Sequence, residues 1–339
     1  MTAVSIIYPT CRKHSRVDWL FDALWYTQTA KNFIHQLIIV DDYAEDEGRK
    51  EEFLRLNNDR FSYKHVAPKP CVWRGKHRLT AKNHFAAGNA RNTGVCYARH
   101  SHLVFIDDTG IPLDGWLDSH LFAAKGRYAL AGSRSKAVFE VENGRPINIT
   151  SLDNDSRGVL GKSINSNIGE NVDSTFFHEI HSNNFSVPLD SFLHINGFDE
   201  KYDGQYGVED CDLSIRLCRS GLVALYDPDC PTLEHKQQGL YMETKEGSKM
   251  KAKRLPCNGI TDSQGRHRHA NESLIFHHNP EGSVADFSSL EADRQRFLPL
   301  GNPFNLRELR ASILNDGEFP IIGLPTHDWR DGQPLTEMK

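Results

Sequence analysis

Two short apolar runs that each end in a pair of aspartates constrain the fold of this chain more than any other feature. Leu37-Ile38-Ile39-Val40 leads into Asp41-Asp42, and Leu103-Val104-Phe105-Ile106 leads into Asp107-Asp108. Continuous apolar runs of this length are typical of strands that are buried on both faces, as in parallel sheets. Ligands of such sheets bind beyond the carboxyl ends of the strands, so both acidic pairs are predicted at a ligand-binding edge.

Segments with helical spacing alternate with these strands. Helices are predicted over residues 17–27, 51–56 and 88–98, and further strands over residues 4–8 and 61–66. This alternation predicts an α/β fold, with a Rossmann-like, mostly parallel sheet that carries helices on both faces. Beyond about residue 125 the pattern is less regular. There we expect a strand near residues 136–141, a helix over 208–219 that ends at Gly221, and a short strand over 223–226.

Composition narrows the class of protein. The chain has 339 residues and a net charge of −5, which argues against broad, non-specific nucleic-acid binding. It has no apolar run long enough to span a membrane, and its first residues do not resemble a secretory signal. Its seven cysteines form no CxxC pair, so neither a zinc knuckle nor a disulfide framework is indicated. We therefore expect a cytoplasmic protein, and peripheral association with a membrane surface is left open.

The acidic pair Asp107-Asp108 has two interpretations. Adjacent carboxylates at a ligand edge suit a hard cation such as Mg²⁺ or Mn²⁺, which would bridge protein and diphosphate oxygens. Aspartate followed by Thr109-Gly110 is also typical of a solvated turn.

A second acidic cluster opens the predicted helix at 208–219. Glu209, Asp210 and Asp212 fall within four positions. Carboxylates at a helix start are stabilising by themselves, through capping and the helix dipole. The functional alternative is a general base that takes a proton from an acceptor hydroxyl.

Two further residues are candidates for ligand binding. Arg91 lies in the first turns of the helix predicted from Gly88, where a phosphate could bind. His235 follows a predicted strand and could complete a metal site with Asp107-Asp108, although a packed histidine is the simpler interpretation.

Seven segments, in this order, resemble the inverting family 2 glycosyltransferases, which have the GT-A fold. They lie at residues 4–10, 37–42, 88–94, 103–116, 184–187, 196–200 and 206–217. The resemblance extends from residue 4 to about residue 235.

The resemblance implies a role for each matching residue. Pro9, Thr10, Arg12, Asp41, Asp42, Arg91, Asp107 and Asp108 would bind a nucleotide-sugar donor, with Asp41 at the base and Arg91 near the diphosphate. Asn184 would lie near the acceptor. Asp210, with Glu209, would be the catalytic base. Asp107, Asp108 and His235 would bind a divalent metal, Mn²⁺ or Mg²⁺. Many relatives have an acid where this chain has Thr109, which puts the exact metal ligands in question.

The implied reaction is transfer of a hexosyl or pentosyl group from a nucleoside-diphosphate sugar to an acceptor hydroxyl, by a single inverting displacement with a divalent metal. A UDP-sugar is favoured over a GDP-sugar, and the acceptor is a glycan or another hydroxyl compound. A nucleic-acid acceptor stays open because residues 67–83 are basic. The alternatives are a non-catalytic nucleotide-sugar or glycan-binding protein and, less favoured, a nucleotidyltransferase.

The same resemblance divides the chain into three parts. Residues 1–125 would be the nucleotide-sugar-binding half of the GT-A domain, and residues 126–245 the acceptor-binding and catalytic half. Residues 246–339 would form a C-terminal extension. At the start of this extension, the basic stretch 245–254 could be a lid or a solvated loop. Inside it, the His-rich stretch 267–278 could bind a metal or consist of surface histidines.

Overall fold

The protein is represented by a computed structural model. It describes residues 2–27, 34–79, 83, 86–153, 182–200, 203, 209–222, 224–236, 241–243, 249–251 and 302–321. The His-rich stretch lies outside these residues, as does the basic stretch 245–254 apart from residues 249–251.

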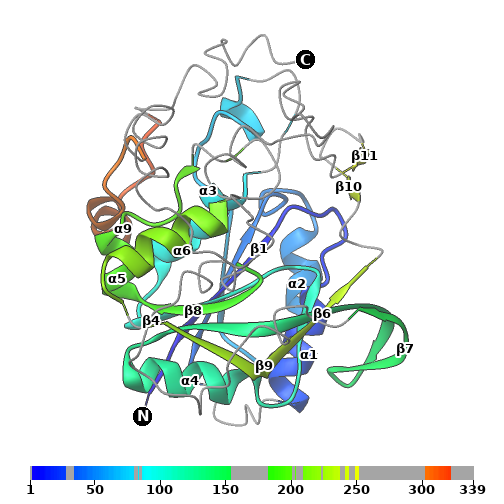
Figure 1. The fold of residues 1–339 in the computed structure, drawn as a ribbon. Helices are drawn as coiled ribbons and strands as arrows, with labels where there is room; N and C mark the ends of the chain where they lie inside the picture. The colour runs from blue at the N-terminus through cyan, green and yellow to red at the C-terminus, as the bar shows by residue number, and fades with distance from the viewer. Residues whose placement is uncertain are drawn as a thin grey trace, which may run out of the picture.

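One large mixed sheet forms the centre of the described structure (Figure 1). Its strands are β1 Ser5–Thr10, β2 Gln36–Asp41, β3 Tyr63–Val66, β4 His102–Ile106, β5 Gly110–Pro112, β6 Ala129–Glu142, β7 Arg145–Asp153, β8 Asn184–Pro188 and β9 Ala224–His235. The order is β3-β2-β1-β4-β8-β6-β9-β5, and β7 pairs with β6. The first four strands in this order are parallel, whereas β8 is antiparallel to both β4 and β6. A separate antiparallel pair joins β10 Tyr241–Glu243 to β11 Lys249–Lys251.

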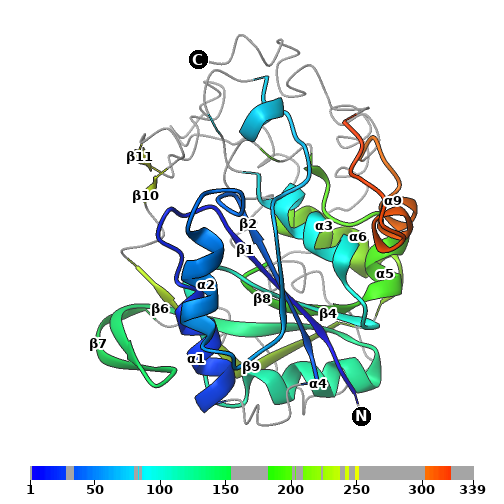
Figure 2. The same cartoon turned by 180° about the vertical axis from the view of Figure 1, so that it is seen from behind.

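Helices cover both faces of the sheet, as predicted (Figures 1 and 2). They are α1 Val17–Tyr26, α2 Arg49–Asn57, α3 Ala87–Tyr97, α4 Trp116–Gly126, α5 Leu189–His194, α6 Glu209–Arg219 and α9 Leu306–Leu314, with a short 3-10 turn at Gly75–His77. One core contains side chains of α1, α2 and α4, and the other contains side chains of α3, α5, α6 and α9. The α/β class is therefore confirmed. Among the described helices, none has both the length and the apolar character that crossing a bilayer requires.

The alternation of side chains along the strands explains why the runs are apolar throughout. Ile7 and Phe105 point into the core with α3 and α6, whereas their neighbours Ile6 and Val104 point into the core with α1 and α4. Because successive side chains point to opposite faces, a strand covered on both sides must be apolar at every position. The polar residues therefore come where the strand ends.

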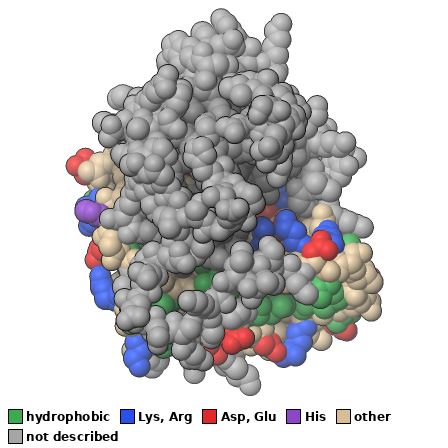
Figure 3. All heavy atoms as spheres, in the orientation of Figure 1, with side chains coloured by type: hydrophobic (Ala, Val, Ile, Leu, Met, Phe, Trp, Pro, Cys, Tyr) green, Lys and Arg blue, Asp and Glu red, His purple; other side chains and the backbone are tan. Residues whose placement is uncertain are grey.

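The hairpin of β6 and β7 was predicted only in part. Its first strand is much longer than the expected strand at 136–141, and its second strand is almost wholly exposed. The hairpin projects from the sheet in Figure 1, and in Figure 3 hydrophobic side chains lie among charged ones on that side of the molecule. The exposed apolar side chains of β7 include Ile149 and Leu152.

Part of the predicted C-terminal extension belongs to the main domain. Leu306, Leu309 and Ile313 of α9 are buried in the core beside α3 and α5. Leu306 N donates to Asn196 Oδ1 (2.7 Å), and Asn302 Nδ2 donates to the carbonyl of Phe198 (2.7 Å). A boundary at residue 246 therefore does not separate residues 302–321 from the domain before it.

The turn at Gly197 lies against Leu306 of α9, and its geometry requires a glycine. Gly197 has φ of +70°, and a Cβ there would lie 2.5 Å from both Asn92 Oδ1 and Leu306 Cδ2. We expect Gly197→Ala to lower the free energy of unfolding in urea by about 3 kcal/mol, from left-handed strain plus overpacking. Gly221 has φ of +79° but open space around its Cβ, so Gly221→Ala should cost only about 1 kcal/mol. Equal losses in the two variants would contradict this account of the turn.

Candidate active site

A pocket lies at the carboxyl ends of β1, β2 and β4. Seven residues predicted from the sequence line it: Pro9, Thr10, Arg12, Asp42, Arg91, Asp107 and Asp108. Three alanines near the start of α3 (Ala86, Ala87 and Ala90) contribute to its wall, together with Cys11, Arg74, Thr109 and Glu234. The parallel arrangement brings the ends of three strands, far apart in sequence, to one edge of the sheet. The structure thus gathers most of the predicted donor residues in one place, and their binding roles stay predictions.

Asp108 is held by residues that follow β1. Thr10 Oγ1 donates to Asp108 Oδ2 (2.8 Å), and Arg12 Nε lies 2.9 Å from the same oxygen in an ion pair. Asp108 is 8% exposed, so its carboxylate is well sheltered from water. The orientation of Asp108 is consequently fixed before any ligand arrives.

Arg91 connects the acidic pair Asp107-Asp108 to the acidic pair Glu209-Asp210. Its side chain is buried, its Nη1 donates to Glu209 Oε1 (3.1 Å), and its Nη2 donates to Asp107 Oδ1 (2.8 Å). Glu209 opens α6 and Asp107 follows β4, so one guanidinium joins the start of α6 to the edge of the pocket. Burial and the neighbouring charge of Asp210 raise the pKa of Glu209 to about 7, although Arg91 opposes the shift.

The two aspartates after β2 have different surroundings. Asp41 is fully buried, and its carboxylate accepts hydrogen bonds from Arg49 Nε (2.7 Å) and the backbone N–H of Tyr43 (3.0 Å), with His65 Nε2 at 3.0 Å. It does not line the pocket, whereas Asp42 does, in an ion pair with Arg74. The geometry therefore runs against a direct base contact by Asp41 and leaves Asp42 as the member of this pair that faces the pocket.

His235 is not placed where the predicted metal site needs it. Along β9, Glu234 faces the pocket, and the alternation of side chains turns His235 to the other side. Its ring packs against Trp19 and Phe139, with centroids 5.8 and 5.0 Å away. This packing gives no support to the prediction that His235 binds metal with Asp107 and Asp108, which stays a prediction. Within the described residues, no group of three His, Cys, Asp or Glu side chains could hold a metal ion by itself.

Asn184 is also placed differently from the acceptor contact that was predicted. Its side chain is fully buried, and its Nδ2 donates to the carbonyls of Cys230 (2.7 Å) and Ser133 (2.9 Å). Its Oδ1 accepts from Trp116 Nε1 (2.9 Å) and lies 3.2 Å from His120 Nε2. All the hydrogen-bonding capacity of the amide is thus used to join β8, β6, β9 and α4. These bonds indicate a structural role for Asn184 and give no support to the predicted acceptor contact, which stays a prediction.

The start of α3 is occupied by a carboxylate of the chain. Asp203 accepts from the backbone N–H groups of Gly88 (2.8 Å) and Asn89 (2.9 Å), which are the groups expected to bind phosphate. Exposed N–H groups at a helix start attract any anion, and here the capping aspartate is supplied by a distant segment. Phosphate binding by this helix start is therefore not supported.

Two cations of the basic segment after β3 are paired with carboxylates. Lys69 pairs with Glu200, and Arg74 pairs with Asp42. Trp73 is buried in a small cluster with Cys71, Val72 and Ala86, so it has no exposed ring on which a base could stack. These contacts give no support to a nucleic-acid acceptor.

Sequence reasoning missed Arg74 and Glu234 as pocket residues. Glu234 lies 3.1 Å from Lys136 Nζ and 3.4 Å from Arg134 Nη1, so it also ties β9 to β6. Strand alternation did not identify Glu234, because the predicted strand ended at residue 226, whereas β9 continues to His235. No local pattern identifies Arg74, whose position depends on the path of the loop.

Comparison with known proteins supports the family-level prediction. Residues 175–236 match the family model described as the N-terminal domain of galactosyltransferase. This segment contains Asn184, the acidic pair Glu209-Asp210 and the end of β9. The segment is glycosyltransferase-like in sequence, which agrees with the motifs found along the chain.

Among solved structures, the crystal structure of S. aureus TarS, residues 1–349, is similar, with a TM-score of 0.42 and 12% sequence identity. The similarity covers 67% of this chain and 60% of that chain, so this chain spans less than two thirds of the TarS structure. Comparison with curated protein sequences gave no match.

Proposed function

We propose that the protein is an inverting glycosyltransferase that moves a sugar from a nucleoside-diphosphate sugar to an acceptor hydroxyl. The observation that carries the proposal is the buried connection from Asp107 through Arg91 to Glu209, which joins the pocket at the strand ends to the acidic start of α6. The galactosyltransferase-like segment supports it, because that segment contains the same helix start.

Asp210 is the proposed base. Glu209 is buried and held by Arg91, whereas Asp210 is only partly buried at the same helix start. An acceptor hydroxyl beside Asp210 would lose its proton as it attacks the anomeric carbon from the face opposite the leaving group. Arg12 and Arg91 would favour the negative charge that develops on the departing nucleoside diphosphate.

A divalent cation fits the residues of the pocket in part. Asp107 and Asp108 offer adjacent oxygen ligands, and Glu234 lines the same pocket. Mg²⁺ and Mn²⁺ are commonly held by one or two carboxylates together with substrate phosphates and waters, so a full protein ligand set is not required. A bound cation would neutralise diphosphate charge. The protein's own contribution is to hold both carboxylates through Arg91, Thr10 and Arg12.

The proposal is tested first by ligand-dependent stability. We expect at least one nucleoside-diphosphate sugar, in the presence of Mn²⁺, to raise the melting temperature. A ligand at one hundred times its Kd stabilises the folded state by about 2.7 kcal/mol. UDP-sugars and GDP-sugars are compared with and without the metal. If no nucleotide sugar stabilises the protein, the pocket is not a donor site and the proposal fails.

The raised pKa of Glu209 gives an expectation for pH dependence. The base must be deprotonated, and the last proton of the Glu209–Asp210 pair leaves at about pH 7, because burial and the neighbouring carboxylate raise the pKa of Glu209. We expect kcat/KM to rise with pH through this range. Glu209→Gln removes the titrating carboxyl group and its negative charge. The inflection in the pH dependence of kcat/KM should therefore move to lower pH. An inflection unchanged in Glu209→Gln would show that another group is titrating.

A further inference from the structure

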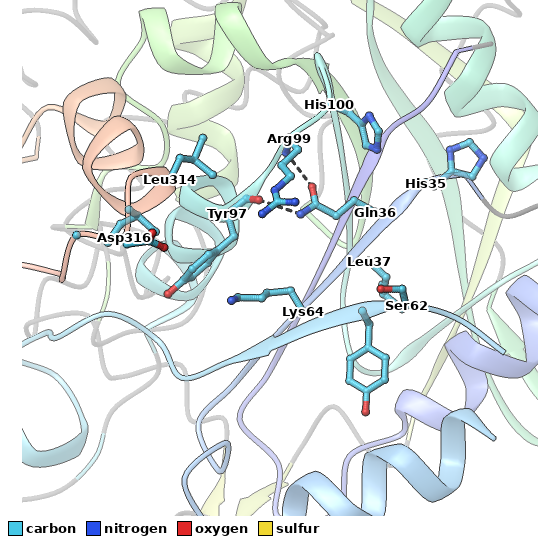
Figure 4. A pocket seen from close by; sticks show the side chains of 13 residues that line it. His35, Gln36, Leu37, Ser62, Lys64, Tyr97, Arg99, His100, Leu314 and Asp316 are labelled. Carbon is cyan, nitrogen blue, oxygen red and sulfur yellow. Dashed lines mark hydrogen bonds between the residues drawn. The ribbon is translucent and has the colours of Figure 1, made fainter. Parts of the chain in front are cut away.

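A second pocket lies at the opposite end of the sheet, and nothing in the reaction proposed above uses it (Figure 4). The donor pocket follows the carboxyl ends of the parallel strands, whereas this cavity is lined by residues at the start of β2 and β3, including Gln36 and Lys64. At about 3.3 Å per residue, Gln36 lies about 20 Å from Asp42 along the strand direction. The two pockets are therefore separate.

The floor of this pocket is a fixed hydrogen-bond network centred on Gln36. Gln36 Nε2 donates to the carbonyl of Tyr97 (2.9 Å), and its Oε1 accepts from the backbone N–H of Arg99 (2.8 Å) and from Ser5 Oγ (2.9 Å). Figure 4 shows two of these bonds crossing between the start of β2 and the segment after α3. The backbone that carries Tyr97 and Arg99 is thus held in place without a ligand, which lowers the ordering cost of binding.

The C-terminal segment supplies the facing wall. Leu314 and Asp316, at the end of α9, line the cavity. Arg310 Nη2 donates to the carbonyl of Ala98 (2.6 Å), and Phe319 packs edge-on against Tyr97 with ring centroids 6.0 Å apart. The pocket therefore exists because residues 302–321 return to the main domain, and it is built from three segments that are distant in sequence.

Of the Lys, Arg, Asp and Glu side chains that line the pocket, two are cations and one is an acid. Within the part of the chain that the structure describes, Lys64 and Arg99 have no carboxylate within ion-pair distance, and Asp316 is the one acidic residue of the lining. Lys64 Nζ lies 5.2 Å from the ring centroid of Tyr97, and Figure 4 shows the Lys64 side chain directed towards that ring. Two lining cations, of which Lys64 lies beside an aromatic ring, distinguish this pocket from the donor pocket, where the arginines are paired with aspartates or a glutamate.

We propose that this second pocket binds a phosphorylated ring compound, with its phosphate between Lys64 and Arg99 and its ring against Tyr97. The cavity of about 640 Å³ is within the range of small-molecule sites. Lysine binds phosphate as a point charge and arginine as a fork of donors, so the pair suits a dianion. The compound could be a sugar phosphate or a nucleotide, which share this chemistry.

Titration calorimetry with glucose 1-phosphate, uridine monophosphate and inorganic phosphate tests the proposal on the full chain. We expect a ring phosphate to bind more tightly than inorganic phosphate. Lys64→Met and Arg99→Met should each weaken that binding about tenfold or more, since each substitution removes a charge-assisted hydrogen bond to the phosphate. Lys125→Met on α4 and Arg55→Met on α2 are matched controls, because both side chains are exposed and neither lines the pocket, and they should bind like the wild type.

The outcomes separate the second pocket from the donor pocket. Tighter binding of glucose 1-phosphate indicates a saccharide ligand, and tighter binding of uridine monophosphate that depends on Lys64 and Arg99 indicates a nucleotide. Absence of binding at millimolar concentrations would overturn the proposal. Binding that survives in Lys64→Met and Arg99→Met but is lost in Asp108→Asn would overturn it too, because the ligand would then be in the donor pocket. Neither result depends on whether sugar transfer occurs.

Discussion

Replacing Asp210 by asparagine is expected to lower the rate of sugar transfer by about 10²–10⁴-fold while nucleotide-sugar binding survives. A positioned general base contributes about this much to a rate, and asparagine keeps the shape of the side chain without its ability to accept a proton. Asp210 is in the first turn of α6 beside Glu209, which Arg91 holds in place. Release of nucleoside diphosphate measures the rate, and the ligand-induced shift in melting temperature measures binding.

The matched control is Asp118→Asn. Asp118 is an exposed aspartate in the first turn of α4, so its substitution removes a similar favourable interaction with a helix dipole without touching the pocket. We expect its activity to equal that of the wild type. Full activity in Asp210→Asn, or a loss in both variants that follows their loss of stability, would exclude Asp210 as the base.

Asn184→Asp is expected to lower the free energy of unfolding by at least about 3 kcal/mol at pH 7. The amide nitrogen donates to two backbone carbonyls, and a carboxylate oxygen in its place would face both of them without a donor. The site is fully buried, so water cannot compensate. Gly132 leaves no room for the side chain to move, since even a Cβ on Gly132 would lie 2.3 Å from Asn184 Nδ2. Urea denaturation followed by circular dichroism measures the loss.

Asn143→Asp makes the same chemical change at an exposed position in the turn between β6 and β7, and it should change stability little. If Asn184→Asp instead retains wild-type stability and loses only transfer, the acceptor-binding role implied by the family resemblance would be correct. The structural role assigned to Asn184 would then be wrong.

The sequence predicted the part of the site that depends on strand ends. Thr10, Asp42 and Asp108 each follow an apolar run, and a parallel sheet necessarily brings such ends to one edge. Arg91 was predicted from its place near a helix start, and the structure does bring it to the pocket. Its partner Glu209 could not be predicted from spacing, because it lies 118 residues further along the chain. Asp107 lies only 16 residues away, but it follows a different element, β4.

His235 and Asn184 show where reasoning from motifs is weakest. His235 was proposed as a metal ligand because it follows a predicted strand, but a shift of one residue along β9 decides which side chain faces the pocket, and Glu234 does. Asn184 was placed near the acceptor by the family resemblance, although a buried amide can equally well satisfy backbone groups where strands meet. Neither distinction is available without the register of the sheet.

The packing of residues 302–321 against the main domain was not predicted either. Leu306, Leu309 and Ile313 have helical spacing, but nothing local shows that their apolar face is buried against α3 and α5. That contact creates the wall of the second pocket, so neither the pocket nor its cations could be recognised from the sequence.

The most direct test of the central claim is the release of nucleoside diphosphate from a panel of nucleotide sugars with Mn²⁺, measured for the wild type and Asp210→Asn side by side. We predict that the wild type releases nucleoside diphosphate from at least one donor that also raises its melting temperature, and that Asp210→Asn binds that donor but releases product about 10²–10⁴-fold more slowly. A donor that stabilises both proteins but is turned over by neither, or by both at equal rates, would contradict the assignment of this chain as a glycosyltransferase with Asp210 as its base.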